Sequence, residues 1–120
     1  MKTQKIKTYE LYGNGLKYAY WIAYGYKSSC DEENIIWMEI INTDIPLDFL
    51  LREFDTMDWK CCGEIIENHK LSVWFDSNRN VWMCKNGSMY ADGSSPMESI
   101  LRVYVMLTVG LEMDIPVDLL

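Results

Sequence analysis

The most apolar stretch of the chain, residues 97–109, has the pattern of a core helix. Its polar residues are Glu98, Ser99, Arg102 and Thr108. They leave water one narrow strip of the predicted helix at most. Ser95 and Glu98 have the spacing of a capping box, in which the hydroxyl of Ser95 accepts from the amide of Glu98 and the carboxylate of Glu98 accepts from the amide of Ser95. With Pro96 at the first helical position and Gly110 after the last turn, the pattern predicts a buried helix on which the other elements pack.

Two further helices and one strand are predicted earlier in the chain. Residues 16–24 place apolar side chains at helical spacing, with Asn14 as the predicted cap. Residues 34–41 carry apolar side chains on both faces and are predicted to form a strand. A second helix is predicted to begin at the polar turn 42–46 and to end at about residue 54, before a loop over 55–60 and one or two helical turns over 63–68.

Strand period dominates the next segment. Leu71, Val73 and Phe75 alternate with their neighbours up to residue 76, and a polar turn separates them from a second predicted strand, 81–85. The pair Asn86-Gly87 favours a tight type I′ hairpin into a third strand, 89–91. The order of elements predicts one α+β domain over residues 1–120, in which helices cover an antiparallel meander.

Composition supports a folded chain with one core. Of 120 residues 49% are apolar, with five Trp and eight Tyr, so burial can offset the conformational entropy lost on folding. No apolar run follows the basic start at residues 1–7, and none is long enough to span a bilayer, so we expect neither secretion nor membrane insertion. Four cysteines without framework spacing predict reduced, mostly buried thiols and a cytoplasmic protein.

The net charge of −7 is unevenly distributed. Residues 1–30 sum to +4, whereas residues 31–69 sum to −9. The acids of this middle third are Asp31, Glu32, Glu33, Glu39, Asp44, Asp48, Glu53, Asp55, Asp58, Glu64 and Glu67, and its bases are Arg52 and Lys60. Such a surface repels a phosphate backbone, so direct nucleic-acid binding is not expected. A basic partner protein and plain solubility are the two interpretations that remain.

Cys61, Cys62 and His69 come closest to a metal or nucleophile motif. Structural zinc sites use cysteines separated by two to four residues, whereas the side chains of adjacent cysteines diverge. No positioning residue or oxyanion-hole motif accompanies a cysteine–histidine pair, and no glycine-rich phosphate loop is present. Acids such as Asp55 and Glu64 have no spacing that forces them together. We therefore expect no metal, no cofactor and no catalysis, with a small hydrolase as the enzymatic alternative.

Trp59 and Arg102 each allow two interpretations. In its predicted loop, Trp59 either covers the edge of the core or offers a stacking face to a ligand or a partner. Arg102 follows Glu98 by four residues, so it either forms an intrahelical ion pair or holds a carboxylate or phosphate in a cleft.

Three blocks of the sequence resemble the NinX-like small proteins of tailed bacteriophages. The first, similar to the family's opening and first helix, is Lys7, Thr8, Glu10, Leu11, Gly13, Leu16, Tyr18 and Ala19. The second, which resembles a Ser-Thr-Asp-Trp stretch before a double glycine and Pro-Ile-Ile-Glu, is Thr56, Asp58, Trp59, Gly63, Ile65, Ile66 and Glu67, with Met57 inserted and Cys62 and Glu64 in place of Gly and Pro. The third, similar to the closing helix and tail, is Gly93, Ser95, Pro96, Ile100, Arg102, Tyr104, Val105, Gly110, Glu112, Ile115 and Pro116.

The resemblance implies a phage accessory protein that acts in the host cytoplasm and belongs to a family without an established reaction. By analogy with accessory proteins of this size, we predict a non-enzymatic role in host takeover or counter-defence through sequestration of a nucleotide-like signal molecule. The alternative is an acidic inhibitor that binds a host defence protein through residues 31–69. The sequence is also compatible with a homo-oligomer.

The predicted ligand site joins family-like residues of two segments. We expect the loop before Gly63 to lie over the polar strip of the last helix and to form a pocket with it. The predicted ligand-binding residues are Asp58, Trp59, Glu67, Arg102, Tyr104, Tyr18 and Tyr20. In this pocket the indole of Trp59 would stack on the ligand, and the guanidinium of Arg102 would hold its anionic group.

Overall fold

The computed structural model describes residues 1–120, which form three α-helices and eight β-strands. The elements are β1 (Thr3–Lys7), α1 (Gly13–Tyr24), β2 (Lys27–Cys30), β3 (Ile36–Ile40), β4 (Thr43–Pro46), α2 (Leu47–His69), β5 (Ser72–Asp76), β6 (Val81–Asn86), β7 (Met89–Gly93), α3 (Pro96–Thr108) and β8 (Glu112–Pro116). Two short 3-10 turns, η1 (Thr8–Glu10) and η2 (Val117–Leu119), follow β1 and β8. The predicted α+β class is confirmed.

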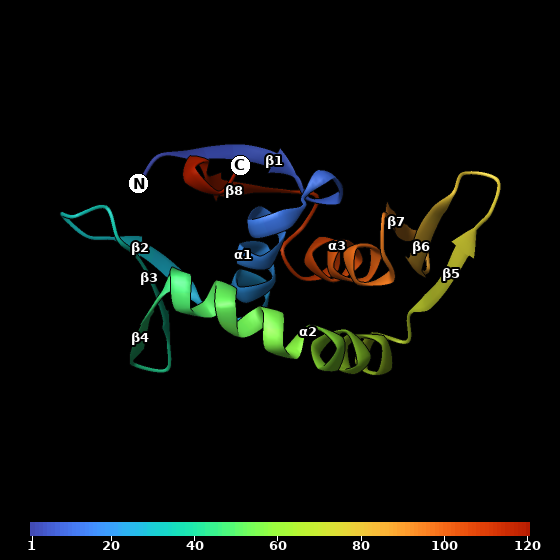
Figure 1. Cartoon of the computed structure of the whole chain (residues 1–120), viewed down its shortest axis with the longest axis horizontal. Helices are drawn as coiled ribbons and strands as arrows, with labels where there is room; N and C mark the ends of the chain where they lie inside the picture. Colours follow the sequence, from blue (N-terminus) through green and yellow to red (C-terminus); the bar gives the residue numbers. More distant parts are fainter.

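The strands form three small antiparallel sheets rather than one (Figure 1). The meander β2-β3-β4 lies at one end of the elongated molecule, and the predicted meander β5-β6-β7 lies at the other. The third sheet pairs β1 with β8, from Thr3 opposite Pro116 to Lys7 opposite Glu112. The three helices occupy the space between these sheets, and α2 runs along one long side of the molecule (Figure 1). The molecule measures 49 × 25 × 23 Å. None of its helices combines the length and the apolar composition that crossing a bilayer requires.

Helix α3 is at the centre of the hydrophobic core, as predicted. It contacts α1, α2, β6 and β7, and the side chains of Ile100, Val103 and Val105 are buried. The predicted start of the helix is also observed, because the hydroxyl of Ser95 accepts a hydrogen bond of 3.1 Å from the amide of Glu98. The carboxylate of Glu98 accepts from the amide of Ser94, not from that of Ser95 as predicted.

Helix α2 corrects the prediction most, because it is one continuous helix of 23 residues. The loop predicted over residues 55–60 is wrong. The buried residues of α2 are Leu47, Leu50, Leu51, Phe54, Cys61, Cys62 and Ile65. Positions 57 and 58 continue this stripe between Phe54 and Cys61, and both are half-buried. Because Asp58 is a polar residue at an inward position, the apolar period looks interrupted in the sequence although the helix continues.

Four strands were missed, and one helix start was misplaced. β1, β2 and β8 lie in segments for which no strand was predicted, and β4 lies within the predicted polar turn 42–46. Helix α1 begins at Gly13, so Asn14 lies inside the helix and is not its cap. These strands are four or five residues long, and each depends on a partner strand that local periodicity does not reveal.

The close approach of β7 to α3 makes Gly93 a position where no side chain fits. A Cβ atom there would lie 2.6 Å from the amide nitrogen of Ser99 and 3.1 Å from the carbonyl carbon of Glu98. We expect Gly93→Ala to lower the free energy of unfolding by about 1 to 3 kcal/mol, the usual cost of overpacking. Gly63→Ala is the control, because a Cβ atom at this exposed helical position meets nothing within 4 Å. It should raise the stability by about 0.5 to 1 kcal/mol in the same urea titration.

Candidate functional site

Of the predicted aromatic residues, Tyr18 and Tyr20 are buried in the core and Tyr104 is half-buried against it, and none lines a main pocket. The ring centroids of Tyr20 and Tyr104 are 5.7 Å apart where α1 meets α3. The hydroxyl of Tyr20 donates to the sulfur of Cys61 at 3.1 Å, and that of Tyr18 lies 2.7 Å from the hydroxyl of Ser28. Burial is the main cause that raises the pKa of each of the three phenols. These side chains therefore stabilise the junction of the helices.

The guanidinium of Arg102 is engaged inside the protein. Its Nε donates to the carbonyl of Leu11 and its Nη1 to the carbonyl of Asp92, both at 2.8 Å. The predicted ion pair with Glu98 forms at 3.4 Å, and a second with the carboxylate of Asp92 forms at 3.6 Å. Because only 12% of the side chain is exposed, little of this cation is open to a ligand.

The remaining predicted site residues, Asp58, Trp59 and Glu67, belong to α2. Because residues 55–60 are helical, no loop lies over the polar strip of α3, and that part of the prediction is wrong. The indole of Trp59 is 61% exposed on the solvent side of the helix. The carboxylate of Asp58 accepts from the amide of Trp59 at 2.8 Å. None of the seven predicted residues lines any of the three main pockets.

The contacts of Arg102 predict a large effect on stability. Arg102→Ala leaves two carbonyl acceptors without their charged donor, so the free energy of unfolding should fall by about 1.5 to 3 kcal/mol. Arg79→Ala is a matched control, since Arg79 also pairs with Asp92 but is half exposed. It should cost at most about 1 kcal/mol. Equal losses for the two variants in urea unfolding would contradict the role assigned to Arg102.

The cysteines are packed thiols. Cys61, Cys62 and Cys84 are buried, and Cys30 is half-buried. Burial raises the pKa of Cys62 to about 12 and that of Cys84 to about 11. His69 packs edge-on against the ring of Tyr104 with centroids 5.6 Å apart. No group of three or more His, Cys, Asp or Glu side chains is placed to hold a metal ion.

Thiol labelling follows from these environments. Because a raised pKa keeps a thiol protonated at pH values below it, Cys62 and Cys84 should stay unlabelled by iodoacetamide from pH 7 to pH 9 in the native protein. Cys30 should be modified first. Peptide mass spectrometry in native buffer and in urea measures this order. Rapid labelling of Cys62 in native buffer would contradict this prediction, because it would show that the packing around Cys62 of α2 opens.

A segment that combines acidic and exposed apolar side chains covers one end and one long side of the molecule. This acidic segment, residues 31–69, forms β3, β4 and α2 in one run of chain (Figure 1). Its exposed large apolar side chains are Ile35, Ile41, Phe49 and Trp59. One ion pair joins it to the basic first part of the chain, between Lys17 of α1 and Asp55. Most of its acids have no salt-bridge partner.

Ile41 is the most unusual residue of the acidic segment. It stands at the tip of the hairpin between β3 and β4, where Ile40 pairs with Thr43 across a two-residue turn. Its φ is +48° and that of Asn42 is +62°. A β-branched residue is strained in this left-handed conformation, which Gly and Asn tolerate far better. The side chain is nevertheless 88% exposed, so the strain is not offset by burial.

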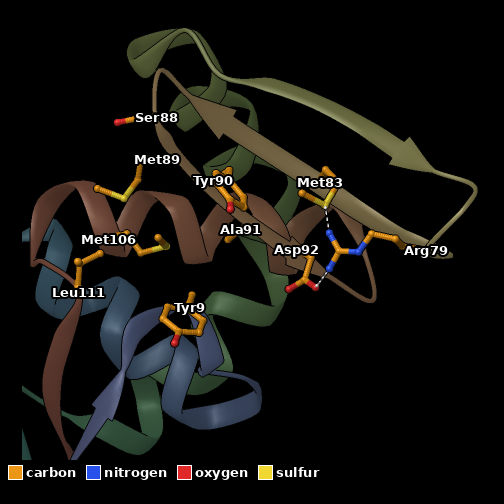
Figure 2. Close-up of a pocket in the computed structure, with 10 residues that line it drawn as sticks. All are labelled: Tyr9, Arg79, Met83, Ser88, Met89, Tyr90, Ala91, Asp92, Met106 and Leu111. Atoms are coloured by element: carbon orange, nitrogen blue, oxygen red, sulfur yellow. Dashed lines mark hydrogen bonds and ion pairs between the residues drawn. The ribbon is translucent and has the colours of Figure 1, made fainter.

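A pocket at the other end of the molecule was not predicted. Its lining comes mainly from η1, β6, β7 and the last turn of α3 (Figure 2). Tyr9, Tyr90 and Leu111 are exposed lining residues, and Met83 and Met106 are buried ones. Its volume is about 350 Å³. Arg79 and Asp92 form an ion pair of 3.1 Å at one end. The only local signal of this pocket is a strand with Met89 and Ala91 on one face, followed by an apolar helix. This signal does not reveal that the turn containing Tyr9 contributes to the pocket.

No protein-family model matches this chain, and a search of curated proteins finds no match either.

Proposed function

We propose that this protein is a non-enzymatic binding protein whose acidic segment occupies a basic, partly apolar surface on another protein. The observation that carries the proposal is Ile41, a strained and almost fully exposed apolar residue at the tip of a hairpin. Local strain persists where the surrounding structure imposes it, and it is concentrated at functional sites. A partner pocket that buries Ile41 would give this residue a role that the fold alone does not.

Trp59 and Phe49 support the same surface. Both are exposed on α2, which adjoins the sheet that carries Ile41. Aromatic residues, and Trp in particular, contribute most to binding energy when a partner desolvates them. A charged rim around apolar anchors is the usual anatomy of a protein interface.

The charge of the acidic segment selects the partner. Its net charge of −9 repels nucleic acids and acidic proteins and attracts a basic surface. Complementary charge of this kind mainly accelerates association, so the rate should fall with ionic strength. The resemblance to NinX-like phage proteins adds the context of this proposal: the partner is a host protein in the cytoplasm, bound during host takeover or counter-defence.

We therefore favour the alternative hypothesis, an acidic inhibitor that binds a host protein, over the sequestration of a nucleotide-like molecule. The sequestration hypothesis relied on Arg102 as the anion-holding group, and Arg102 donates instead to the carbonyls of Leu11 and Asp92. It also required Trp59 to face that cation across a pocket, and Trp59 lies on the exposed side of a helix. Binding of a basic protein surface through the acidic segment requires neither of these two arrangements.

Ile41→Asn separates a role in binding from a role in folding, because the two effects have opposite signs. Asn tolerates the left-handed turn, so the variant should gain up to about 1 kcal/mol of stability. It should also lose affinity for the partner recovered by the immobilised protein from a bacterial lysate. Trp59→Ala should lose the same partner and leave the stability within about 0.5 kcal/mol.

Trp74→Ala is the matched control, because Trp74 is an exposed tryptophan on β5 at the far end of the molecule. It should retain the partner. Association measured by biolayer interferometry should slow as salt rises from 50 to 500 mM for the wild-type protein. A partner that binds Ile41→Asn and Trp59→Ala as tightly as wild type, or that binds at a rate independent of salt, contradicts the proposal.

A further inference from the structure

The unpredicted pocket has the lining of a small-molecule site. Its lining includes the buried side chains of Met83, Met106 and Ala91 and the exposed rings of Tyr9 and Tyr90. Ala91 lies on the face of the sheet that packs on α3, and Met83, which pairs with Asp92, lies on the other face, so the pocket extends around the edge strand β7. The two tyrosines come from different elements, Tyr9 from η1 and Tyr90 from β7 (Figure 2). Thioether side chains are flexible and polarisable, and they make favourable contacts with aromatic rings. A volume of about 350 Å³ lies at the lower end of the range for ligand pockets, so it suits a flat body of one or two rings.

At the polar end of the pocket, the Asp92 carboxylate is paired with two arginines, whereas Arg79 keeps N–H donors for a ligand. One oxygen of the Asp92 carboxylate pairs with Arg79 at 3.1 Å, and the other lies 3.6 Å from Arg102. The guanidinium of Arg79 gives one N–H group to Asp92 and another to the sulfur of Met83 at 3.6 Å. A thioether is a weak acceptor, so an anionic oxygen can replace it at little cost. Because 55% of the Arg79 side chain is exposed, a ligand can reach its guanidinium.

A second cation lies next to the pocket. The ammonium of Lys7 stands 5.9 Å from the centroid of the Tyr9 ring. A cationic ligand would therefore meet Arg79 and Lys7 and would find the Asp92 carboxylate already paired with two arginines. An anionic ligand would meet the available N–H groups of Arg79, in the geometry that guanidinium offers to carboxylate, sulfonate or phosphate oxygens.

We propose that this pocket binds a small planar aromatic anion, with its ring against the methionines and the two tyrosines and its charged group on Arg79. The site shares no residue with the acidic segment. Its occupant can therefore bind together with a protein partner, and a failure of this proposal leaves the proposed function untouched.

Methionine-methyl NMR tests the location of the site. The probe is naphthalene-1-sulfonate, a planar two-ring aromatic sulfonate, added to the folded protein with ¹³C-labelled methionine methyl groups. The chain has eight methionines, which act as reporters throughout the molecule. The signals of Met83, Met89 and Met106 should shift saturably, while those of Met38, Met57 and Met113 stay in place. Shifts centred on Met57 in α2, or no saturable shift up to the millimolar range, overturn the proposal.

Arg79→Ala tests the anionic recognition, with an uncharged probe of the same shape as a comparison. The variant should bind the sulfonate about tenfold more weakly, the effect of losing a charge-assisted hydrogen bond. It should bind 1-methylnaphthalene, which has a similar shape but no anionic group, with unchanged affinity. Tyr90→Ala should weaken both probes, and Tyr90→Phe neither, because the ring and not the hydroxyl makes the contact. Equal affinity of wild type and Arg79→Ala for the sulfonate overturns the anionic specificity, and a loss of native circular dichroism on probe addition overturns specific binding.

Discussion

The fold depends on two polar anchors that join the start of the chain to helix α3. Arg102 donates to the carbonyl of Leu11, and Thr8 donates through its hydroxyl to the carbonyl of Gly110 at 2.8 Å. Thr8 is fully buried, so water cannot replace the carbonyl of Gly110 as the partner of its hydroxyl, or the carbonyl of Leu111 as the partner of its amide. Between these anchors the turn η1 is fixed along α3, which in turn sets the direction in which α1 leaves it. Helix α1 then positions its aromatic side chains against α2.

The elements that were predicted correctly are those whose signals are local. The start of α3 is encoded within four residues, and the hairpin between β6 and β7 was also predicted from a local signal. The predicted type I′ turn at Asn86-Gly87 is wrong, because Asn86 pairs with Met89 and the turn is Gly87-Ser88, in which only Gly87 has a positive φ. α2 was predicted as a helix that ends at about residue 54 and separate turns over 63–68, because the polar residue Asp58 at a half-buried position interrupts the apolar period while the helix continues. The pairing of β1 with β8 joins segments more than one hundred residues apart, so no local pattern could predict it.

The candidate site was harder to predict because its residues interact with backbone groups. The pairing of Arg102 with Glu98 was foreseen from their spacing, but the carbonyls of Leu11 and Asp92 leave no trace in the side-chain pattern. The acidic character of residues 31–69 was evident from composition alone. The strain at Ile41 was not, since a two-residue turn between Ile40 and Thr43 becomes visible only once their register is known.

Because α2 is one continuous helix, it also fixes the spacing of exposed side chains that a binding partner must match. A helix rises about 1.5 Å per residue and turns once in 3.6 residues, so the step of ten residues from Phe49 to Trp59 places their backbone positions about 15 Å apart along the axis and about 80° apart around it. Buried side chains from Leu47 to Ile65 hold this helix against the core, so the spacing of Phe49 and Trp59 is fixed before a partner binds. A surface that receives both rings must carry two recesses at that interval. One that matches the spacing binds without the entropy cost of ordering a flexible loop.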